Sequence, residues 1–354
     1  MIRGLALLGV FLVPTVVTPT AATPERPAVV YDSDMDFDDA STLALLCEEH
    51  KLGRIDLRAV TVANDGFGMP GRARRHAHSV LEQCGRPDIP VADGATGEGV
   101  HPAPPELVAT IETVLTGALD DAGRTSPPSR LTAAQLIALT ALTSRHPITV
   151  LATGPMSNVA DALAVPGVPA RIGRVQLMGG AIAVGGNLYG SALPGFDNSQ
   201  EFNLWMDPPA ARDLLRRARP GSIHLVPLDA TRFVPITDEY VARIGASARA
   251  PGARIAYRIA SQPDLAALID LDIMFWWDAL AAVSLVHPSV VTASRPARIA
   301  IVQDGAQSGR TVETAHGTPV TVVTEADRAA FEQMFLDGLN GVSPRDNPAV
   351  GHRG

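Results

Sequence analysis

Short runs of β-branched and other apolar residues alternate with longer amphipathic stretches along most of the chain. This alternation predicts an α/β fold with one large domain, in which a mostly parallel central sheet carries helices on both faces. The expected strands are 28–31, 55–63, 148–152, 174–178 and 223–226, followed by a strand-like pair at 297–302 and 319–323. The expected helices are 39–50, 72–84, 131–144, 208–217, 275–286 and 326–339.

The first residues have the three parts of a secretory signal peptide. Arg3 supplies a positive charge, an apolar run covers 4–13, and small residues follow at 21–22. Pro14 and Pro19 interrupt the apolar stretch well short of the ~20 residues that a membrane-spanning helix needs. Export is therefore expected, with a secreted or periplasmic mature protein.

These features divide the chain into three parts. Residues 1–22 form the expected signal peptide, 23–343 a single domain, and 344–354 a flexible tail. No other segment is long and apolar enough to span a membrane, so no membrane span is expected in the mature protein. The Pro- and Gly-rich segment 94–130 is expected to be an elaborated loop region over the functional site.

Export also bears on the two cysteines, Cys47 and Cys84. Each falls near the end of an expected helix, and right-handed crossovers would place the ends of these two helices side by side. In an oxidising compartment two such thiols can pair, provided that their Cα atoms lie within ~7 Å. The sequence leaves open both a Cys47–Cys84 disulfide and two buried free thiols.

Composition and charge exclude several classes of protein. With 46% hydrophobic and 19% charged residues, the chain can bury a sizeable core and is not mainly disordered. Its 29 basic and 37 acidic residues give a formal charge of −8, and Lys51 is the only lysine. Such a chain is poorly suited to bind nucleic acid. The nine histidines and two cysteines are too scattered for a Cys/His zinc module.

Five carboxylates fall within eight residues between the first expected strand and the first helix: Asp32, Asp34, Asp36, Asp38 and Asp39. This density is repulsive unless a cation lies among the carboxylates, and oxygen ligands in this number suit Ca²⁺ or Mg²⁺. An EF-hand is excluded because its sixth position would be Phe37 rather than glycine. An acidic surface turn is an alternative, but the apolar strand and helix on either side favour the functional edge of the sheet.

Further polar groups fall at the ends of later expected strands. They are Asn64, Thr-Gly-Pro at 153–155, Met-Gly-Gly at 178–180, and Glu-Phe-Asn at 201–203, which precedes a helix opened by Asp207. Each alone is an ordinary turn element. Together, at the carboxyl ends of parallel strands, they predict a polar pocket over a metal.

In this order the residues resemble the signature of nucleoside hydrolases of the inosine/uridine-preferring superfamily, and the resemblance covers about 29–339. The core signature, Asp-x-Asp-x-x-x-Asp-Asp, is matched by Asp32, Asp34, Asp38 and Asp39. The later markers are Asn64, 153–158, 178–180, 186–187, 201–203, 207–208 and Asp278. The resemblance implies the nucleoside hydrolase fold, with its Rossmann-like core, and Ca²⁺-dependent hydrolysis of ribonucleosides to ribose and free base.

The resemblance also implies roles for single residues. The Ca²⁺ ligands would be Asp34, Asp39, the backbone carbonyl of Thr153, and Asp278, with Asp34 also the general base for the attacking water. The ribose would be held by Asp38, Asn64, Asn187, Glu201 and Asn203. Asp32, Asp36 and Met178 would support the site, Asp36 standing where many family members have glycine. Because family members are often dimers or tetramers, a homo-oligomer is expected.

One departure from the family leaves the base unidentified. Trp277 stands where many members have a histidine that assists the leaving base, and stacking of an indole on the base is one substitute. Only one of two adjacent helical residues can face the pocket, and Trp277 is favoured over Trp276. Phe202 is a further candidate for the base pocket.

Two other functions stay open at this point. The first is a nucleoside- or sugar-binding protein of the same fold without turnover. The second is a metal phosphohydrolase with Asp32 or Asp34 as nucleophile. It is less favoured because no convincing downstream lysine is present to hold a phosphate.

Overall fold

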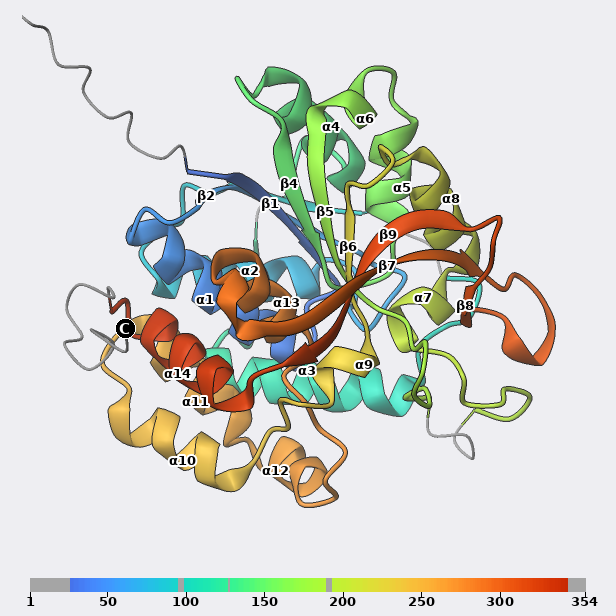
Figure 1. Ribbon diagram of the computed structural model, residues 1–354. Coiled ribbons are helices and arrows are strands. Elements are labelled where there is room, and N and C mark those ends of the chain that lie inside the picture. Colours follow the sequence, from blue (N-terminus) through green and yellow to red (C-terminus); the bar gives the residue numbers. More distant parts are fainter. Residues whose placement is uncertain (1–25, 95–98, 127, 189–192, 343–354) are drawn as a thin grey trace, which may run out of the picture.

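A computed structural model describes residues 26–94, 99–126, 128–188 and 193–342 (Figure 1). The expected signal peptide at 1–22 and tail at 344–354 lie outside these residues. Within the described ranges, no helix has both the length and the apolar composition needed to cross a membrane.

A twisted sheet runs through the centre of the described domain, in the order β3-β2-β1-β4-β5-β6-β9-β7-β8. All pairings are parallel except those of β7, which runs antiparallel to β9 and β8. The first six strands follow the doubly wound Rossmann order, which confirms the predicted fold class. The strands are β1 Ala28–Ser33, β2 Asp56–Val62, β3 Val91–Asp93, β4 Ile148–Ala152, β5 Ile172–Met178, β6 Ile223–Val226, β7 Val291–Ile301, β8 Thr311–Glu313 and β9 Thr318–Ala326.

Helices cover both faces of the sheet, as Figure 1 shows. Successive residues of β1 point to opposite faces, so Val29 and Tyr31 join one core cluster and Val30 joins the other. The second cluster packs under α4 Ala133–Thr143, α5 Ser157–Ala164, α6 Val168–Arg171 and α8 Pro208–Arg217. The first lies under α1 Phe37–Lys51, α2 Arg72–Gln83, α3 Pro105–Leu119, α10 Asp238–Ser247, α11 Pro251–Ala260, α12 Pro263–Ile269, α13 Trp277–Val286 and α14 Arg328–Leu339.

Short helical elements complete the domain at the loops. They are α7 Phe202–Met206, α9 Leu228–Thr231, η2 Pro288–Val290 and η3 Gly305–Gln307. Four predicted helix starts shift by two residues in the structure, and two of these shifts, at α1 and α13, bear on the site. Helix α1 begins at Phe37 because Asp36 caps it, and α13 begins at Trp277 because Phe275 forms an isolated β-bridge with Pro235. Both shifts place aspartates in the first turn of a helix.

The prediction of a loop region over 94–130 is wrong for its middle part, which is the helix α3. Apolar residues at Leu107, Ile111, Val114 and Ala118 follow helical spacing, and Pro105 occupies the first helical position. The flanking prolines and glycines obscured this signal. The correction matters because α3 forms a wall of the cavity described below.

Cys47 and Cys84 are free in the structure, and both are buried. The hydrogen bond between the Cys84 and Cys47 thiols and burial both raise the pKa of the Cys84 thiol. The sequence left open a disulfide or two free thiols, and the structure contains two adjacent buried free thiols.

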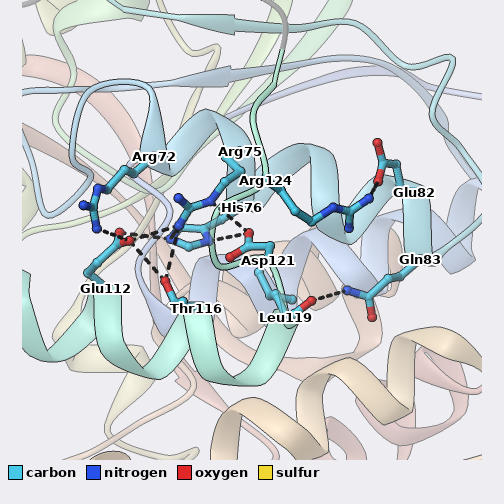
Figure 2. A network of polar contacts seen from close by, with 10 residues as sticks. All are labelled: Arg72, Arg75, His76, Glu82, Gln83, Glu112, Thr116, Leu119, Asp121 and Arg124. Carbon is cyan, nitrogen blue, oxygen red and sulfur yellow. Dashed lines mark hydrogen bonds and ion pairs between the residues drawn. The ribbon is translucent and has the colours of Figure 1, made fainter.

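A buried network of polar contacts joins α3 to α2 (Figure 2). The ring of His76 lies between two carboxylates, with Nδ1 2.9 Å from Asp121 Oδ2 and Nε2 3.1 Å from Glu112 Oε2. Arg72 and Arg75 also donate to Glu112 Oε1, at 2.7 and 3.0 Å. Ionised carboxylates only accept hydrogen bonds, so both ring nitrogens of His76 act as donors. The network fixes α3 against the rest of the domain.

Replacing His76 by leucine should lower the free energy of unfolding by about 3 kcal/mol, because Asp121 and Glu112 would lose a buried cationic partner. Urea denaturation of both proteins measures this difference. The control is His78→Leu, a half-buried position on the same helix, which should change stability much less. Equal losses for the two variants would show that the network does not stabilise α3.

Candidate active site

The candidate site lies where β1 and β4 are neighbours, at the point where the strand order reverses. In doubly wound sheets, ligands bind beyond the carboxyl ends of the strands at such a point. Asp34 follows β1, Thr153 follows β4 and Met178 ends β5. Asp278, far away in the sequence, reaches the same place from the first turn of α13. The topology therefore gathers residues that the chain separates by more than two hundred positions.

The turn between β1 and α1 is built by Asp36. Its side chain accepts hydrogen bonds from the backbone N–H groups of Asp38 and Asp39, at 3.0 and 3.3 Å, and Asp39 Oδ2 accepts from the Asp36 N–H at 3.0 Å. This is a capping box, which satisfies N–H groups that have no partner within the helix. The carboxylates of the first turn also lie at the positive end of the helix dipole. Asp36, which stands where many family members have glycine, thus has a structural role as the N-cap of α1.

Asp39 is held by donors from two strands. Its Oδ1 accepts from the Tyr31 hydroxyl at 2.7 Å and from the Thr153 hydroxyl at 2.6 Å. The backbone carbonyl of Thr153 accepts from Asn203 Nδ2 at 3.1 Å. Asp39, the Thr153 carbonyl and Asn203 therefore form one connected set.

Asp34 is enclosed by backbone. Its Oδ2 accepts from the Phe67 N–H at 2.7 Å. A Cβ atom at Gly66 would lie 2.1 Å from Asp34 Oδ2, and one at Gly154 would lie 2.7 Å from the Asp34 nitrogen. Only glycine permits these approaches, so two loops fix the position of this carboxylate.

Asp278 joins the cluster through the start of α13. Its N–H donates to Asp38 Oδ2 at 3.0 Å. Carboxylate oxygens of Asp36, Asp38 and Asp278 all lie within 4.8 Å of one another. This compact set differs from the predicted ligand set of Asp34, Asp39, Thr153 and Asp278, and only Asp278 is common to both. The sequence argument assigned Asp38 to the ribose and Asp36 to a supporting place, so neither was predicted as a metal ligand.

Burial dominates the electrostatics of the cluster. It raises the pKa values of Asp34, Asp38 and Asp278 well above their usual range, and neighbouring carboxylates raise them further. Burial likewise raises the pKa of Asp36 to about 6 and that of Asp32 to about 7. Asp32 lies behind the site, where Thr61 and Asn158 donate to its Oδ1 at 2.6 and 2.9 Å.

The predicted ribose residues lie around these carboxylates, but they are not all equally exposed to the cavity. Glu201 caps α7, its Oε2 accepting from the Gly180 N–H at 2.9 Å, and burial raises its pKa to about 7. Asn187 Oδ1 accepts from the Phe202 N–H at 3.1 Å. Asp38, Asn187, Glu201 and Asn203 line the cavity. Asn64 is buried, donates to the Gly94 carbonyl at 3.3 Å and is not among the lining residues; its Oδ1 has no partner.

The two adjacent tryptophans, Trp276 and Trp277, lie in different environments. Trp277 is half-buried, lines the cavity and lies against Phe37 at a ring distance of 6.4 Å. Trp276 packs in the core against Tyr240 and Phe335 and does not line the cavity. Its proposed place in a base pocket is therefore withdrawn. Phe202 lines the cavity with Phe67, their rings 5.2 Å apart.

The cavity has a volume of about 350 Å³, within the range of small-molecule sites. Its described lining residues include five acidic side chains and no lysine, arginine or histidine: Asp36, Asp38, Glu106, Glu201 and Asp278 are the acidic ones. The ring of His101 instead stacks on Trp205, at 5.1 Å. With hard oxygen donors and no basic residue lining the cavity, the site fits a divalent cation.

A buried carboxylate site at the switch point of a doubly wound sheet, beside a small-molecule cavity, defines an α/β enzyme. The family model described as inosine-uridine preferring nucleoside hydrolase matches residues 29–333. The pyrimidine-specific ribonucleoside hydrolase RihA of Shewanella woodyi is 30% identical over 334 residues, which cover 90% of this chain and 99% of that protein. The chain belongs to the inosine-uridine preferring nucleoside hydrolase family and is a hydrolase of N-glycosyl bonds in nucleosides.

Solved structures agree with this fold. The inosine-uridine preferring nucleoside hydrolase from Bacillus anthracis superposes with a TM-score of 0.76 at 23% identity, covering 89% of this chain and 100% of that one. A purine-preferring ribonucleoside hydrolase from Gardnerella vaginalis gives a TM-score of 0.69 at 20% identity, covering 89% and 98%. Asp36, Asp38 and Asp278 together offer a group of carboxylate oxygens that could hold a metal ion.

A divalent cation should stabilise the protein more at high pH than at low pH. Asp36 and Asp32, with raised pKa values of about 6 and 7, are neutral in the folded protein near pH 4 and charged above pH 7. Burial of the charged carboxylates, and then their repulsion, therefore removes stability as pH rises through this range. Millimolar Ca²⁺ offsets that repulsion. Thermal unfolding with and without Ca²⁺ should therefore show a larger Tm increase at pH 8 than at pH 5.

The control for this measurement is Asp88→Asn, an exposed position, which should leave the Ca²⁺-induced shift unchanged. Asp39→Asn should reduce it. A shift that is the same at both pH values would contradict a cation among the buried carboxylates.

Proposed function

We propose that this chain is a Ca²⁺-dependent ribonucleoside hydrolase that releases ribose and a free base. One observation carries the proposal: Thr153 and Asp278 line a cavity together with other polar side chains, and Asp34 and Asp39 lie next to them without lining it. This arrangement lies within a domain of the nucleoside hydrolase family. Hydrogen-bond acceptors and donors of the same wall suit a sugar with several hydroxyl groups.

The ion would be held by Asp34, Asp39, Asp278 and the backbone carbonyl of Thr153. When bound, Ca²⁺ supplies positive charge that orients a water molecule and makes it more acidic. The Thr153 and Tyr31 hydroxyls orient Asp39, and Asn203 orients the Thr153 carbonyl. These contacts hold the donors in place before substrate arrives.

Asp34 is the proposed general base. The Phe67 N–H and the close packing of Gly66 and Gly154 hold its carboxylate in one position. From there it accepts the proton of the water that attacks C1′ of the ribose. A fixed base lowers the entropic cost of reaching the transition state.

The remaining carboxylates act on the sugar. Positive charge develops on the ribose ring as the N-glycosidic bond breaks, and nearby fixed carboxylates stabilise that charge. Asp38 and Glu201 line the cavity beside Asn187 and Asn203, so all four are assigned to the ribose. Asn64 is assigned a supporting place behind them.

Asp34→Asn should lower kcat by about 10²–10⁴-fold because it removes the proton acceptor while keeping the shape of the side chain. Chromatography of inosine, adenosine, uridine and cytidine reactions, each with Ca²⁺ or EDTA, measures base release. The fold should survive, since the substitution removes one charge from a repulsive cluster. Asp88→Asn is the matched control and should keep full activity.

The same assay separates the competing functions. Full activity of Asp34→Asn would overturn the assignment of the base. Ribonucleoside binding by calorimetry without any base release would instead indicate a binding protein, and release of phosphate from nucleotides would indicate a phosphohydrolase. The screen also reports the preferred base, on which the relatives differ, since one is named pyrimidine-specific and another purine-preferring.

We further propose that the protein is exported after cleavage near residue 22, and that it forms a homo-oligomer. The basic, apolar and small-residue parts of 1–22 support export. Expression of the full chain in a bacterial host should give a protein whose N-terminal peptide, found by mass spectrometry, begins near residue 23. An intact N-terminus on protein from the cell interior would contradict export.

A further inference from the structure

The cavity has two chemically different ends. Acidic and amide side chains surround the end at the sheet. The other end lies between α3, α12 and the segment before α13, and its lining is apolar: Leu107, Ile111, Val114, Leu265, Leu268 and Met274. The three α3 residues share one face of that helix because they follow helical spacing. The apolar end is therefore a continuation of the nucleoside site rather than a separate pocket.

The residues of the inner wall of this apolar end are largely buried. The exposed fractions are 2% for Val114, 1% for Leu265 and 5% for Met274. Polar groups of α3 lie at its outer edge: Glu106 is exposed, and the Thr110 hydroxyl donates to the Glu106 carbonyl at 2.9 Å. The inner wall thus offers no side-chain hydrogen bond to the polar edge of a base.

We infer that the site selects ribonucleosides whose base carries an apolar substituent, such as an alkyl group on an exocyclic amine or on a pyrimidine ring carbon. This inference rests on the proposed function, because it assumes that the ribose occupies the acidic end. With the ribose there, the base extends toward α3 and α12. A substituent that fills the apolar end removes apolar surface from water, whereas an unsubstituted polar edge would lose hydrogen bonds with water and gain none.

A series of nucleosides with alkyl groups of increasing length tests the inference. Adenosines alkylated on the exocyclic amine, and uridines alkylated at carbon five, are compared with methyl, propyl and pentyl groups. These groups differ little in their electronic effect, so differences report contacts with the cavity. We expect kcat/KM to rise roughly fourfold per added methylene until the apolar end is filled. The free alkylated bases should inhibit in the same order, which measures binding without the chemical step.

Two variants narrow the apolar end. Val114→Phe places a ring on its inner wall, and Leu268→Phe does so from a half-buried position on α12, which keeps the test available should the first variant not fold. Each should lower kcat/KM for the alkylated nucleosides much more than for the parent nucleoside, so that the gain from alkylation is lost. Thr113→Phe, on the exposed face of α3, is the matched control and should keep the gain.

The outcomes separate this inference from the proposed function. Cleavage of the parent nucleosides with no gain on alkylation would overturn the inference and keep the hydrolase. No cleavage of any nucleoside would overturn the proposed function itself. A gain that persists in both Val114→Phe and Leu268→Phe would show that the substituent lies elsewhere.

Discussion

The architecture of the site depends on one constraint, which is that several carboxylates are buried together without a basic residue among the described lining of the cavity. Buried like charges repel, and the structure offsets this by local means. The first turns of α1 and α13 offer backbone N–H groups to the cluster, and Tyr31 and Thr153 donate hydroxyl groups to Asp39. These contacts orient the carboxylates but do not neutralise them. The proposed divalent cation would supply the missing charge and so offset the cost of this arrangement.

The cavity joins this charged region to an apolar one, and the two have different structural origins. The charged end is formed at the carboxyl ends of parallel strands, as doubly wound sheets generally provide. The apolar end is formed by α3 and α12, two of the helices that cover one core cluster of the domain. Because the His76 network fixes α3 to α2, the apolar wall is part of the rigid domain. The reaction and the choice of base are therefore assigned to different parts of the molecule.

The position of Trp277 links these two regions. It occupies the first residue of α13, directly before Asp278, and it packs against Phe37, the first residue of α1. One side chain thus borders both the aspartates proposed to hold the metal and the apolar part of the cavity. An indole at this place has no readily titrating proton, so the departure of the base depends on stacking and on the leaving group itself. This is consistent with a pocket that selects the base by shape and apolar contact.

The sequence by itself determined the α/β class of the fold, the acidic turn and the family, because each depends mainly on short motifs of residues that are neighbours along the chain. Runs of β-branched residues predict buried strands, and Asp34, Asp38 and Asp39 stand at the spacing of the family signature. Tertiary structure alone decided which groups meet. It moved Asp36 into a helix cap, placed Trp276 in the core and Trp277 at the cavity, and made α3 a wall rather than a loop. The physical reason is that these outcomes depend on packing between α1, α3, α12 and α13, and local periodicity carries no information on which distant surfaces come into contact.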